Sequence, residues 1–330
     1  MSRRRELILA AGLMPLATPL AVLAQPTPRM RQIGYLSLGN SASEVGQLTR
    51  SIVRESLRRA GWEEGRNLMI ERRYAEGDLD RLDAMARELV RLDVELIYAS
   101  LNAPILAAKK ATSNIPIVMS GAVEPVQLGF VQSLAHPGGN VTGAAAPGVD
   151  TAAKSVQILR DVAPDLTRLA ILSNLTSQST QTFNDARIRA ASSLGMTVEV
   201  FAYRQSEDLT VALQRIAASK AQMLVVNYDG IVESRLRDIT DFAVKHKILS
   251  IGTATVFTTV GGALYYGSSL QEIIDRAVSF IDRILRGAKP ADLPVEQPTN
   301  FDLIVNLKTM RALGISVPQS VLLRATELIQ

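Results

Sequence analysis

Hydrophobic positions along the chain switch repeatedly between two periods. The apolar run Ile33–Leu38 is followed by a polar loop, and then by apolar residues that recur every three or four positions between Val45 and Leu57. Two further runs, Leu68–Tyr74 and Val94–Ala99, are each followed by the same change of period. Short β-branched runs predict buried strands, and the helical period predicts amphipathic helices. Strands that alternate with helices predict parallel sheets covered on both faces, which is an α/β fold.

The same alternation begins again after residue 150. The strands predicted for this half are 169–172, 197–201, 223–226, 249–251 and 263–266, and the helices are 152–162, 182–194, 209–218, 231–246 and 270–286. A chain of 330 residues is longer than a single hydrophobic core usually supports, so we expect two domains. Between the two halves lies the breaker cluster Pro137–Asn140, which we interpret as a hinge.

The N-terminus has the pattern of an export signal. Arg3–Arg5 precede the apolar stretch Leu7–Leu23, and small residues favour cleavage of a signal peptide, residues 1–24. The basic start fits both the Sec route and the twin-arginine route, which stay open. A buried helix or a membrane anchor is the alternative. Two prolines in the stretch break a helix, however, and the stretch is short for a full span.

Composition narrows the compartment and the partners. Cysteine is absent, so the chain has no disulfide, no thiolate nucleophile and no residue for lipid attachment after the signal peptide. An exported protein without a lipid anchor is retained only inside an outer membrane. We therefore expect the mature chain in the periplasm with no stable membrane insertion, and we expect it to be a monomer. The net charge of +4 falls to +2 without the signal peptide and forms no basic tract, which argues against nucleic-acid binding.

No catalytic or metal-binding motif accompanies the predicted strand ends. His136 and His246 have no cysteine or paired acidic residues at metal-ligand spacing. The Gly-x-Ser-x-Gly elbow, the Gly-x-Gly-x-x-Gly turn and the P-loop are absent from the places where they would act. We therefore expect no enzyme, no cofactor and no metal site, and an unfamiliar hydrolase is the enzyme class that the sequence leaves open.

Three segments carry a resemblance to a known family. They are IPIVM…EPVQLGFVQSLAHPGGNVTG within 115–143, GWEEGRNLMIERRYAEGDLDRL at 61–82 and ILRGAKPADLPVEQPTNFDLIVNLKTMRALGI at 284–315. From Ile33 onward, the chain resembles the periplasmic substrate-binding proteins of ABC transporters whose best-known members bind tryptophan or phenylalanine. The resemblance implies a type I periplasmic binding protein fold, in which two Rossmann-like lobes with parallel sheets are joined by a multi-crossing hinge and close on a small molecule.

The resemblance also divides the chain between the two lobes. It places the helix 270–286 back in the first lobe. Lobe 1 then comprises residues 31–142 plus 268–292, and lobe 2 comprises residues 143–267 plus 293–330. The three crossings between the lobes are expected near 138–143, 266–270 and 290–298.

Ligands of open α/β sheets bind beyond the carboxyl ends of the strands, where backbone N–H groups at helix starts favour anions. The loops after the predicted strands are rich in serine, asparagine and threonine, which suit hydrogen bonding to a small polar ligand. These residue types are also helix caps and turn formers, so each loop has a purely structural alternative. The candidate ligand-binding residues are Ser37, Asn40, Ser41, Ser100, Leu101, Asn102, Gly121, Glu124, Asn174, Asn227, Tyr228, Asp229 and Thr253.

Two acidic positions are candidates for binding a ligand ammonium. Glu124 stands where the family more often has aspartate before Pro-Val, and Asp229 falls in a loop that often carries an acidic residue or an amide. A hinge or loop contact is the alternative for Glu124, and a helix N-cap is the alternative for Asp229. Tyr228 could stack on a flat ligand or belong to the core. The ligand carboxylate would meet N–H groups and hydroxyls of Ser37–Ser41 and Ser100–Ala103.

These features together predict the substrate-binding component of an ABC importer, which delivers an amino acid or related zwitterion to a membrane permease and its ATPase. A sensor partner in place of the transporter is the alternative that stays open. A transcription regulator can share the fold, but residues 25–30 leave no room for a helix-turn-helix before the first strand. Departures from the family pattern at 100–102, 173–175 and 252–254 leave the ligand identity open.

Overall fold

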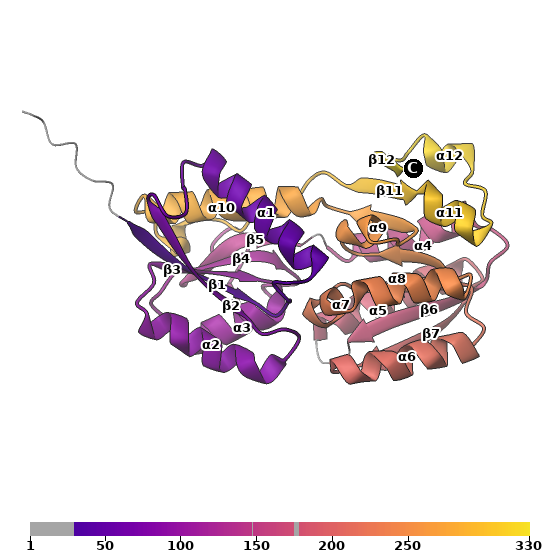
Figure 1. The fold of residues 1–330 in the computed structure, drawn as a ribbon, viewed down its shortest axis with the longest axis horizontal. Coiled ribbons are helices and arrows are strands. Elements are labelled where there is room, and N and C mark those ends of the chain that lie inside the picture. The colour runs from indigo at the N-terminus through magenta and orange to yellow at the C-terminus, as the bar shows by residue number, and fades with distance from the viewer. Residues whose placement is uncertain (1–29, 147, 175–177) are drawn as a thin grey trace, which may run out of the picture.

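The chain folds into two lobes that lie side by side, each with a central sheet between helices (Figure 1). The computed structural model describes residues 30–146, 148–174 and 178–330, so the predicted signal peptide, 1–24, lies outside the described residues. Helices alternate with strands along the chain, and the strands run parallel apart from one pair. The predicted α/β class with two Rossmann-like lobes is confirmed.

The sheet of the first lobe has five parallel strands in the order β2-β1-β3-β4-β5. Its elements are β1 (Arg31–Ser37), α1 (Glu44–Arg59), β2 (Leu68–Tyr74), α2 (Leu79–Arg91), β3 (Leu96–Ser100), α3 (Asn102–Ala111), β4 (Ile117–Ala122), β5 (Val141–Ala145) and α10 (Leu270–Leu285). Apolar residues pair across the sheet, for example Ile97 with Ile117. Because the central strands are buried on both faces, their sequences are apolar almost without interruption.

The sheet of the second lobe has seven strands in the order β12-β11-β10-β9-β8-β6-β7. Its elements are α4 (Asp150–Val162), β6 (Arg168–Asn174), α5 (Gln178–Ser193), β7 (Thr197–Tyr203), α6 (Ser206–Ala218), β8 (Met223–Val226), α7 (Gly230–Ser234), α8 (Leu236–Lys245), β9 (Leu249–Gly252), α9 (Val256–Thr259), β10 (Leu264–Gly267), β11 (Asp302–Asn306), α11 (Leu307–Leu313), α12 (Gln319–Leu322) and β12 (Glu327–Ile329). Strand β11 runs antiparallel to β10, which departs from the expectation of purely parallel sheets.

Helix α10 returns from the second lobe to cover the first sheet (Figure 1). Its residues Ile274, Ala277 and Ile281 belong to one buried cluster with Ile33 of β1 and Leu96 of β3. These positions recur at helical spacing, so they form one stripe along the helix. The first lobe is thus built from two segments that are distant in the sequence.

The border between the lobes differs from the expected one. Strand β5 pairs with β4, so the expected boundary between residues 142 and 143 falls inside a strand of the first sheet. The breaker cluster Pro137–Asn140 precedes this strand, and its interpretation as a hinge is wrong. Glycine and proline mark a turn within a domain as readily as a crossing between domains.

The last crossing is also displaced along the sequence. The backbone N–H of Glu296 donates to the carbonyl of Gly143, and the carbonyl of Glu296 accepts from the N–H of Ala145. These bonds hold the chain along the edge of the first sheet past residue 293. The expected boundary between 292 and 293 therefore falls before the chain leaves the first lobe.

The helix predicted over 231–246 is two helices, α7 and α8. Arg235, with φ −122° and ψ 16°, separates them. The hydroxyl of Ser234 donates to the carbonyl of Ile231 at 2.8 Å, a local bond of the kind that competes with regular helical bonding. The break separates α8 from α7, whose first residue, Gly230, lies against Leu38 of the first lobe.

Candidate ligand-binding site

A cavity of about 300 Å³ lies between the two lobes. Its wall in the first lobe comes from the carboxyl ends of β1, β3 and β4, and its wall in the second lobe comes from the ends of β6, β8, β9 and β10. Parallel strands bring their carboxyl ends to the same edge of a sheet, which is why these loops meet. The volume lies at the lower end of the range of about 300 to 1,000 Å³ for small-molecule pockets, so the cavity suits one small ligand.

Most residues that the sequence singled out line this cavity. They do so because each directly follows or ends a strand that points toward the other lobe. The first lobe contributes Ser37, Ser100, Leu101, Asn102 and Gly121, and the second lobe contributes Asn174, Asn227, Tyr228, Asp229 and Thr253. Their contacts with a ligand stay predictions.

Three candidates do not belong to the lining, namely Asn40, Ser41 and Glu124. The side-chain oxygen of Asn40 accepts the N–H of Ala42 at 2.8 Å, which is a local turn before α1. Glu124 adopts a left-handed backbone with φ 50°, and its carbonyl accepts the N–H of Leu128 at 3.0 Å. The turn-forming alternative therefore fits Asn40 and Glu124. Glu124 is not placed to meet a ligand ammonium in this cavity.

Several polar residues of the second lobe bond one another beneath the cavity surface. The amide of Asn227 donates to the hydroxyl of Ser173 at 3.2 Å and to the amide oxygen of Asn184 at 3.1 Å. The hydroxyl of Thr253 accepts the backbone N–H of Tyr228 at 2.9 Å. These bonds fix the loops after β8 and β9, so Asn227 and Thr253 hold the wall in shape.

One loop of the first lobe is held in a strained conformation. Leu101 has φ 66°, a region that residues with a side chain rarely adopt, and its N–H donates to the carbonyl of Ser120 at 2.9 Å. A Cβ added to Gly121 would lie 3.6 Å from the Leu101 side chain, so the two loops pack closely. Strain of this kind concentrates at ligand-binding loops, where the surrounding fold maintains it.

Asp229 caps helix α7 and has its hydrogen bonds filled by the second lobe. One carboxylate oxygen accepts the N–H groups of Ile231 and Val232 at 2.9 and 2.8 Å, and the other accepts from Asn174 at 3.0 Å and Tyr203 at 2.9 Å. Burial raises the pKa of Asp229, and these four hydrogen bonds oppose the rise. The N-cap alternative is the one that the structure displays.

Glu233 is a second acid in the cavity, and the sequence reasoning missed it. It lies on α7, and its carboxylate accepts the hydroxyl of Tyr228 at 2.9 Å. Its other oxygen lies against the backbone of Gly39 in the first lobe, where a side chain would overlap it. Burial, and to a lesser degree the charge of Asp229, raise the pKa of Glu233 to about 7. Its spacing of four residues from Asp229 was the available signal, since one helical turn returns it to the same face.

Tyr35, Tyr74 and Tyr98 of β1, β2 and β3 form an aromatic wall in the first lobe. The ring of Tyr35 lies 5.5 Å from that of Tyr74 and 5.3 Å from that of Tyr98. Burial raises the pKa of Tyr98 to about 12 and that of Tyr35 further, so both hydroxyls are neutral at physiological pH. The sequence did not single them out, because a tyrosine within a predicted strand is expected to be a core residue.

Arg187 of α5 is a buried cation on the second wall of the cavity. Its side chain is nearly inaccessible to solvent, with the residue 2% exposed, and its guanidinium lies 6.0 Å from the centre of the Phe183 ring. Burial lowers the pKa of Arg187 to about 10, which leaves it charged at neutral pH. A lone arginine within a predicted helix carries no signal in the sequence.

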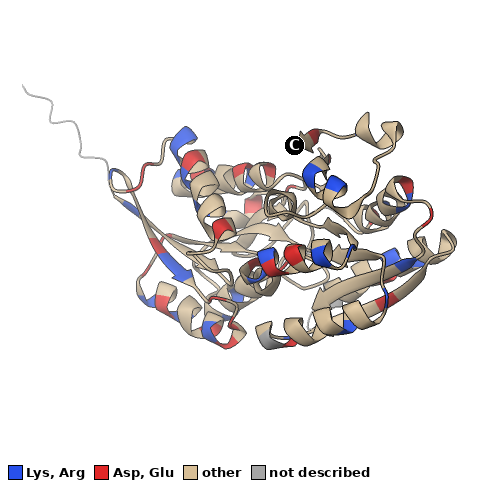
Figure 2. Ribbon diagram, turned by 45° about the vertical axis from the view of Figure 1, so that its right-hand side comes forward, with Lys and Arg blue, Asp and Glu red and all other residues tan. Residues whose placement is uncertain are grey.

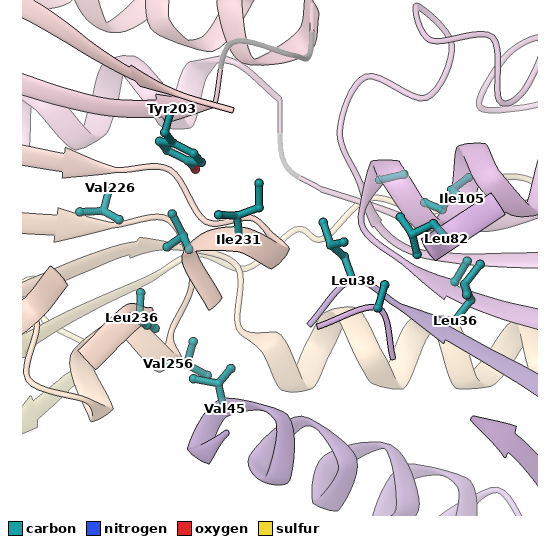
Figure 3. Packing of buried hydrophobic residues seen from close by; sticks show 14 of the residues in the cluster. Leu36, Leu38, Val45, Leu82, Ile105, Tyr203, Val226, Ile231, Leu236 and Val256 are labelled. Carbon is teal, nitrogen blue, oxygen red and sulfur yellow. The ribbon is translucent and has the colours of Figure 1, made fainter. Parts of the chain in front are cut away.

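The two lobes touch each other beside the cavity. Leu38 of the first lobe points toward Ile231 of the second, and Val45 lies beside Val256 within one hydrophobic cluster that includes residues of both lobes (Figure 3). At the rim, Arg237 of α8 forms an ion pair with Glu44 of α1. The lobes are therefore closed over the cavity.

Charge is mixed over the surface. Figure 2 shows Lys and Arg interspersed with Asp and Glu along the helices of both lobes. Within residues 30–146, 148–174 and 178–330, no group of three or more His, Cys, Asp or Glu is placed to hold a metal ion. In the same part of the chain, no helix is long and apolar enough to cross a membrane.

The chain is similar to known proteins in both sequence and structure. The chain is 24% identical over 262 residues to the tyrosine-binding protein of Clostridioides difficile (strain R20291), a match covering 79% of this chain and 75% of that protein. The ABC domain from Streptococcus pneumonia, solved in complex with L-Trp, gives a TM-score of 0.83 at 24% identity and covers 91% of this chain and 100% of that one. A conserved domain protein from Vibrio cholerae gives 0.81 at 24% identity, covering 91% and 99%.

These solved structures confirm the type I periplasmic binding fold. The family model described as "ABC transporter substrate binding protein" matches residues 45–329, which run from α1 to β12 and include segments of both cavity walls. The match spans most of the chain and includes the three sequence segments that carry the resemblance. This protein therefore belongs to the family of ABC transporter substrate-binding proteins.

Proposed function

We propose that this protein is the periplasmic substrate-binding component of an ABC importer, which closes two lobes on an amino acid or related zwitterion and delivers it to a membrane permease and its ATPase. The observation that carries the proposal is the cavity between the lobes, whose walls come from the strand ends of both. A ligand that contacts both lobes favours the closed arrangement over the open one. Delivery then requires the lobes to separate at the permease.

The chemistry of the cavity supports an amino acid as the ligand. The tyrosine wall offers a flat apolar surface with hydroxyl groups, and the opposite wall carries the cation Arg187 and the acid Glu233, whose pKa is about 7. An aromatic amino acid combines a flat apolar ring with a carboxylate and an ammonium, which complements these groups. The binding of tyrosine and L-Trp by the related proteins named above supports the same class.

Two features of the sequence support the periplasm as the site of action. Residues 1–24 have the pattern of a cleavable export signal. The chain contains no cysteine that a lipid could modify after cleavage. N-terminal sequencing of protein from a periplasmic extract should find a mature form that begins near Gln25, and an intact form in the cytoplasm would contradict export.

Calorimetry tests the ligand class. The mature protein, freed of any bound ligand by unfolding and refolding, is titrated with each of the twenty common L-amino acids. We expect saturable one-to-one binding of at least one of them, with aromatic side chains preferred. Failure of all twenty to bind a correctly folded protein would contradict the proposed ligand class.

Uptake separates transport from sensing. A strain that lacks this gene should take up the radiolabelled ligand more slowly, and the wild-type gene should restore the rate. Unchanged uptake together with the loss of a transcriptional response to the ligand would assign the protein to a sensor system instead.

A further inference from the structure

Among the described residues, the buried charge of Arg187 in the cavity wall has no counter-charge. The Nε and Nη1 atoms of Arg187 are buried and have no hydrogen-bond partner among the described residues. No ion pair within this part of the chain includes Arg187. A buried arginine normally pairs with a carboxylate, because burying a charge without compensation is costly.

The acids that share the cavity are already engaged elsewhere. Apart from tyrosines, the ionisable residues among the described lining are Arg187, Asp229 and Glu233. Asp229 accepts four hydrogen bonds from its own lobe, and Glu233 accepts from Tyr228 and lies against Gly39. The wall of the second lobe thus presents a cation toward the space that a ligand would fill.

We propose that Arg187 is the anchor for a carboxylate of the ligand, so that the substrate class is a small carboxylic acid and, within the proposed function on which this inference rests, an amino acid bound through its carboxylate. The planar guanidinium presents paired N–H groups that match the two oxygens of a carboxylate. The ring of Phe183 supports the guanidinium at 6.0 Å, which holds it in place before the ligand arrives.

This assignment changes the orientation expected from the sequence. The loops Ser37–Ser41 and Ser100–Ala103 of the first lobe were expected to hold the carboxylate. With the carboxylate on Arg187 in the second lobe, the body of the ligand extends toward the tyrosine wall of the first lobe. The second lobe then supplies the charge recognition and the first lobe supplies the aromatic surface.

Matched analogues test the role of the carboxylate. The probes are L-tyrosine, tyramine, which lacks the carboxylate, and 3-(4-hydroxyphenyl)propionate, which lacks the ammonium, together with the corresponding set built on tryptophan. Calorimetry on the mature wild-type protein should show binding by the amino acid and the propionate of at least one set. The amine of that set should bind at least about thirtyfold more weakly, because it leaves Arg187 unpaired.

Substitution of Arg187 tests the partner. Arg187→Gln should weaken binding of the carboxylates by about thirtyfold or more and leave the weak binding of the amine unchanged. Arg187→Lys keeps the charge but lacks the planar guanidinium, so its affinity for the carboxylates should lie between those of the wild type and Arg187→Gln. Arg215→Met is the matched control, because Arg215 also lies over an aromatic ring of the second lobe, that of Phe201 at 5.6 Å, but does not line the cavity.

A second measurement needs no ligand. Arg187→Met removes an unpaired buried charge, so the ligand-free variant should melt at a higher temperature than the wild type. A carboxylate that binds the wild type should raise its melting temperature and leave that of Arg187→Met nearly unchanged.

The outcomes distinguish the two proposals. If amines bind as tightly as the carboxylates, or if Arg187→Gln binds carboxylates with wild-type affinity, Arg187 does not anchor the ligand carboxylate. The proposed substrate-binding function would be unaffected by either result. If the wild type binds none of the probes and none of the twenty amino acids, the proposed ligand class and the role of Arg187 as its anchor are both wrong.

Discussion

At the scale of single residues, two carboxylates one helical turn apart have different environments. Asp229 is surrounded by donors, whereas Glu233 has Tyr228 on one oxygen and the backbone of Gly39 on the other side. The structural role of Asp229 follows from its four hydrogen bonds. Glu233 is the acid whose pKa burial raises to about 7.

Replacing Asp229 with Asn should destabilise the protein by about 1–3 kcal/mol, because an amide group would point a donor at the donors of Tyr203 and Asn174. Chemical denaturation of the ligand-free protein measures the change. Asp78→Asn is the control, since Asp78 caps α2 through the N–H of Asp80 alone and asparagine caps nearly as well. If the two substitutions lower stability equally, Asp229 contributes no more than an ordinary helix N-cap.

Replacing Glu233 with Gln should remove a pH dependence of stability. The folded protein holds the proton of Glu233 up to about pH 7, whereas an unfolded chain releases it near its ordinary pKa of 4.5. Between these values the folded state binds more protons than the unfolded state, so wild-type stability falls as pH rises from about 4.5 to 7.

Melting temperatures of the ligand-free proteins across this range measure the effect. The Glu233→Gln curve should meet that of the wild type near pH 4.5 and lie above it at pH 7.5. Glu44→Gln at the exposed rim is the control and should leave the slope unchanged. If the melting temperature of Glu233→Gln falls with pH as steeply as that of the wild type, a group other than Glu233 causes the pH dependence.

At the scale of elements, helix α10 joins distant parts of the sequence into one core. Ile281 is fully buried against the first sheet, although it follows β5 by more than a hundred residues. The helix therefore stabilises the first lobe. It also follows β10 of the second lobe directly, so the chain crosses between the lobes just before it. By contrast, α7 is too short to be stable alone, and its position depends on the cap by Asp229 and on packing against the first lobe.

Ile281→Ala should lower the free energy of unfolding by about 2–5 kcal/mol, because it leaves a cavity beneath the sheet. Urea denaturation followed by circular dichroism measures it. Ser279→Ala on the exposed face of the same helix should change stability by about 0.5 kcal/mol or less. A small effect of Ile281→Ala would show that the first lobe does not depend on α10.

At the scale of the whole molecule, closure depends on a close approach between the lobes. Gly230 begins α7, and a Cβ at this position would lie 2.6 Å from the Cβ of Leu38 in the first lobe. Such an overlap exists only when the lobes are closed. The glycine therefore permits the closed arrangement, while the ion pair of Arg237 with Glu44 is solvent-exposed and contributes little.

Gly230→Ala should weaken ligand binding by about tenfold or more, because the added methyl group pushes Leu38 away and favours the open arrangement. Small-angle scattering with saturating ligand should show a larger radius for this variant than for the wild type. Gly139→Ala is the control, since no atom lies within 4 Å of its added Cβ. Wild-type affinity in Gly230→Ala would show that closure does not bring Leu38 this close.

Most strands and helices, and ten of the residues that line the cavity, can be predicted from the sequence alone. Hydrophobic period is a local property, so β2 and β8 appear where it predicts them, and strand ends such as Ser37 and Ser100 are found in the same way. The break between α7 and α8 was missed because the apolar period continues across it, while the backbone of Arg235 leaves the helical region.

Which side chains of the helices and strand interiors face the cavity depends on how the two lobes pack together. Arg187, Glu233 and Tyr98 lie within helices and strands, where the sequence pattern predicts a side chain that is either in the core or exposed to solvent. They face the cavity instead because the two lobes meet there. The lobes are held together by contacts between segments far apart in the chain. The pairing of β5 with the first sheet was decided in the same way, since a turn and a hinge have the same local sequence signals.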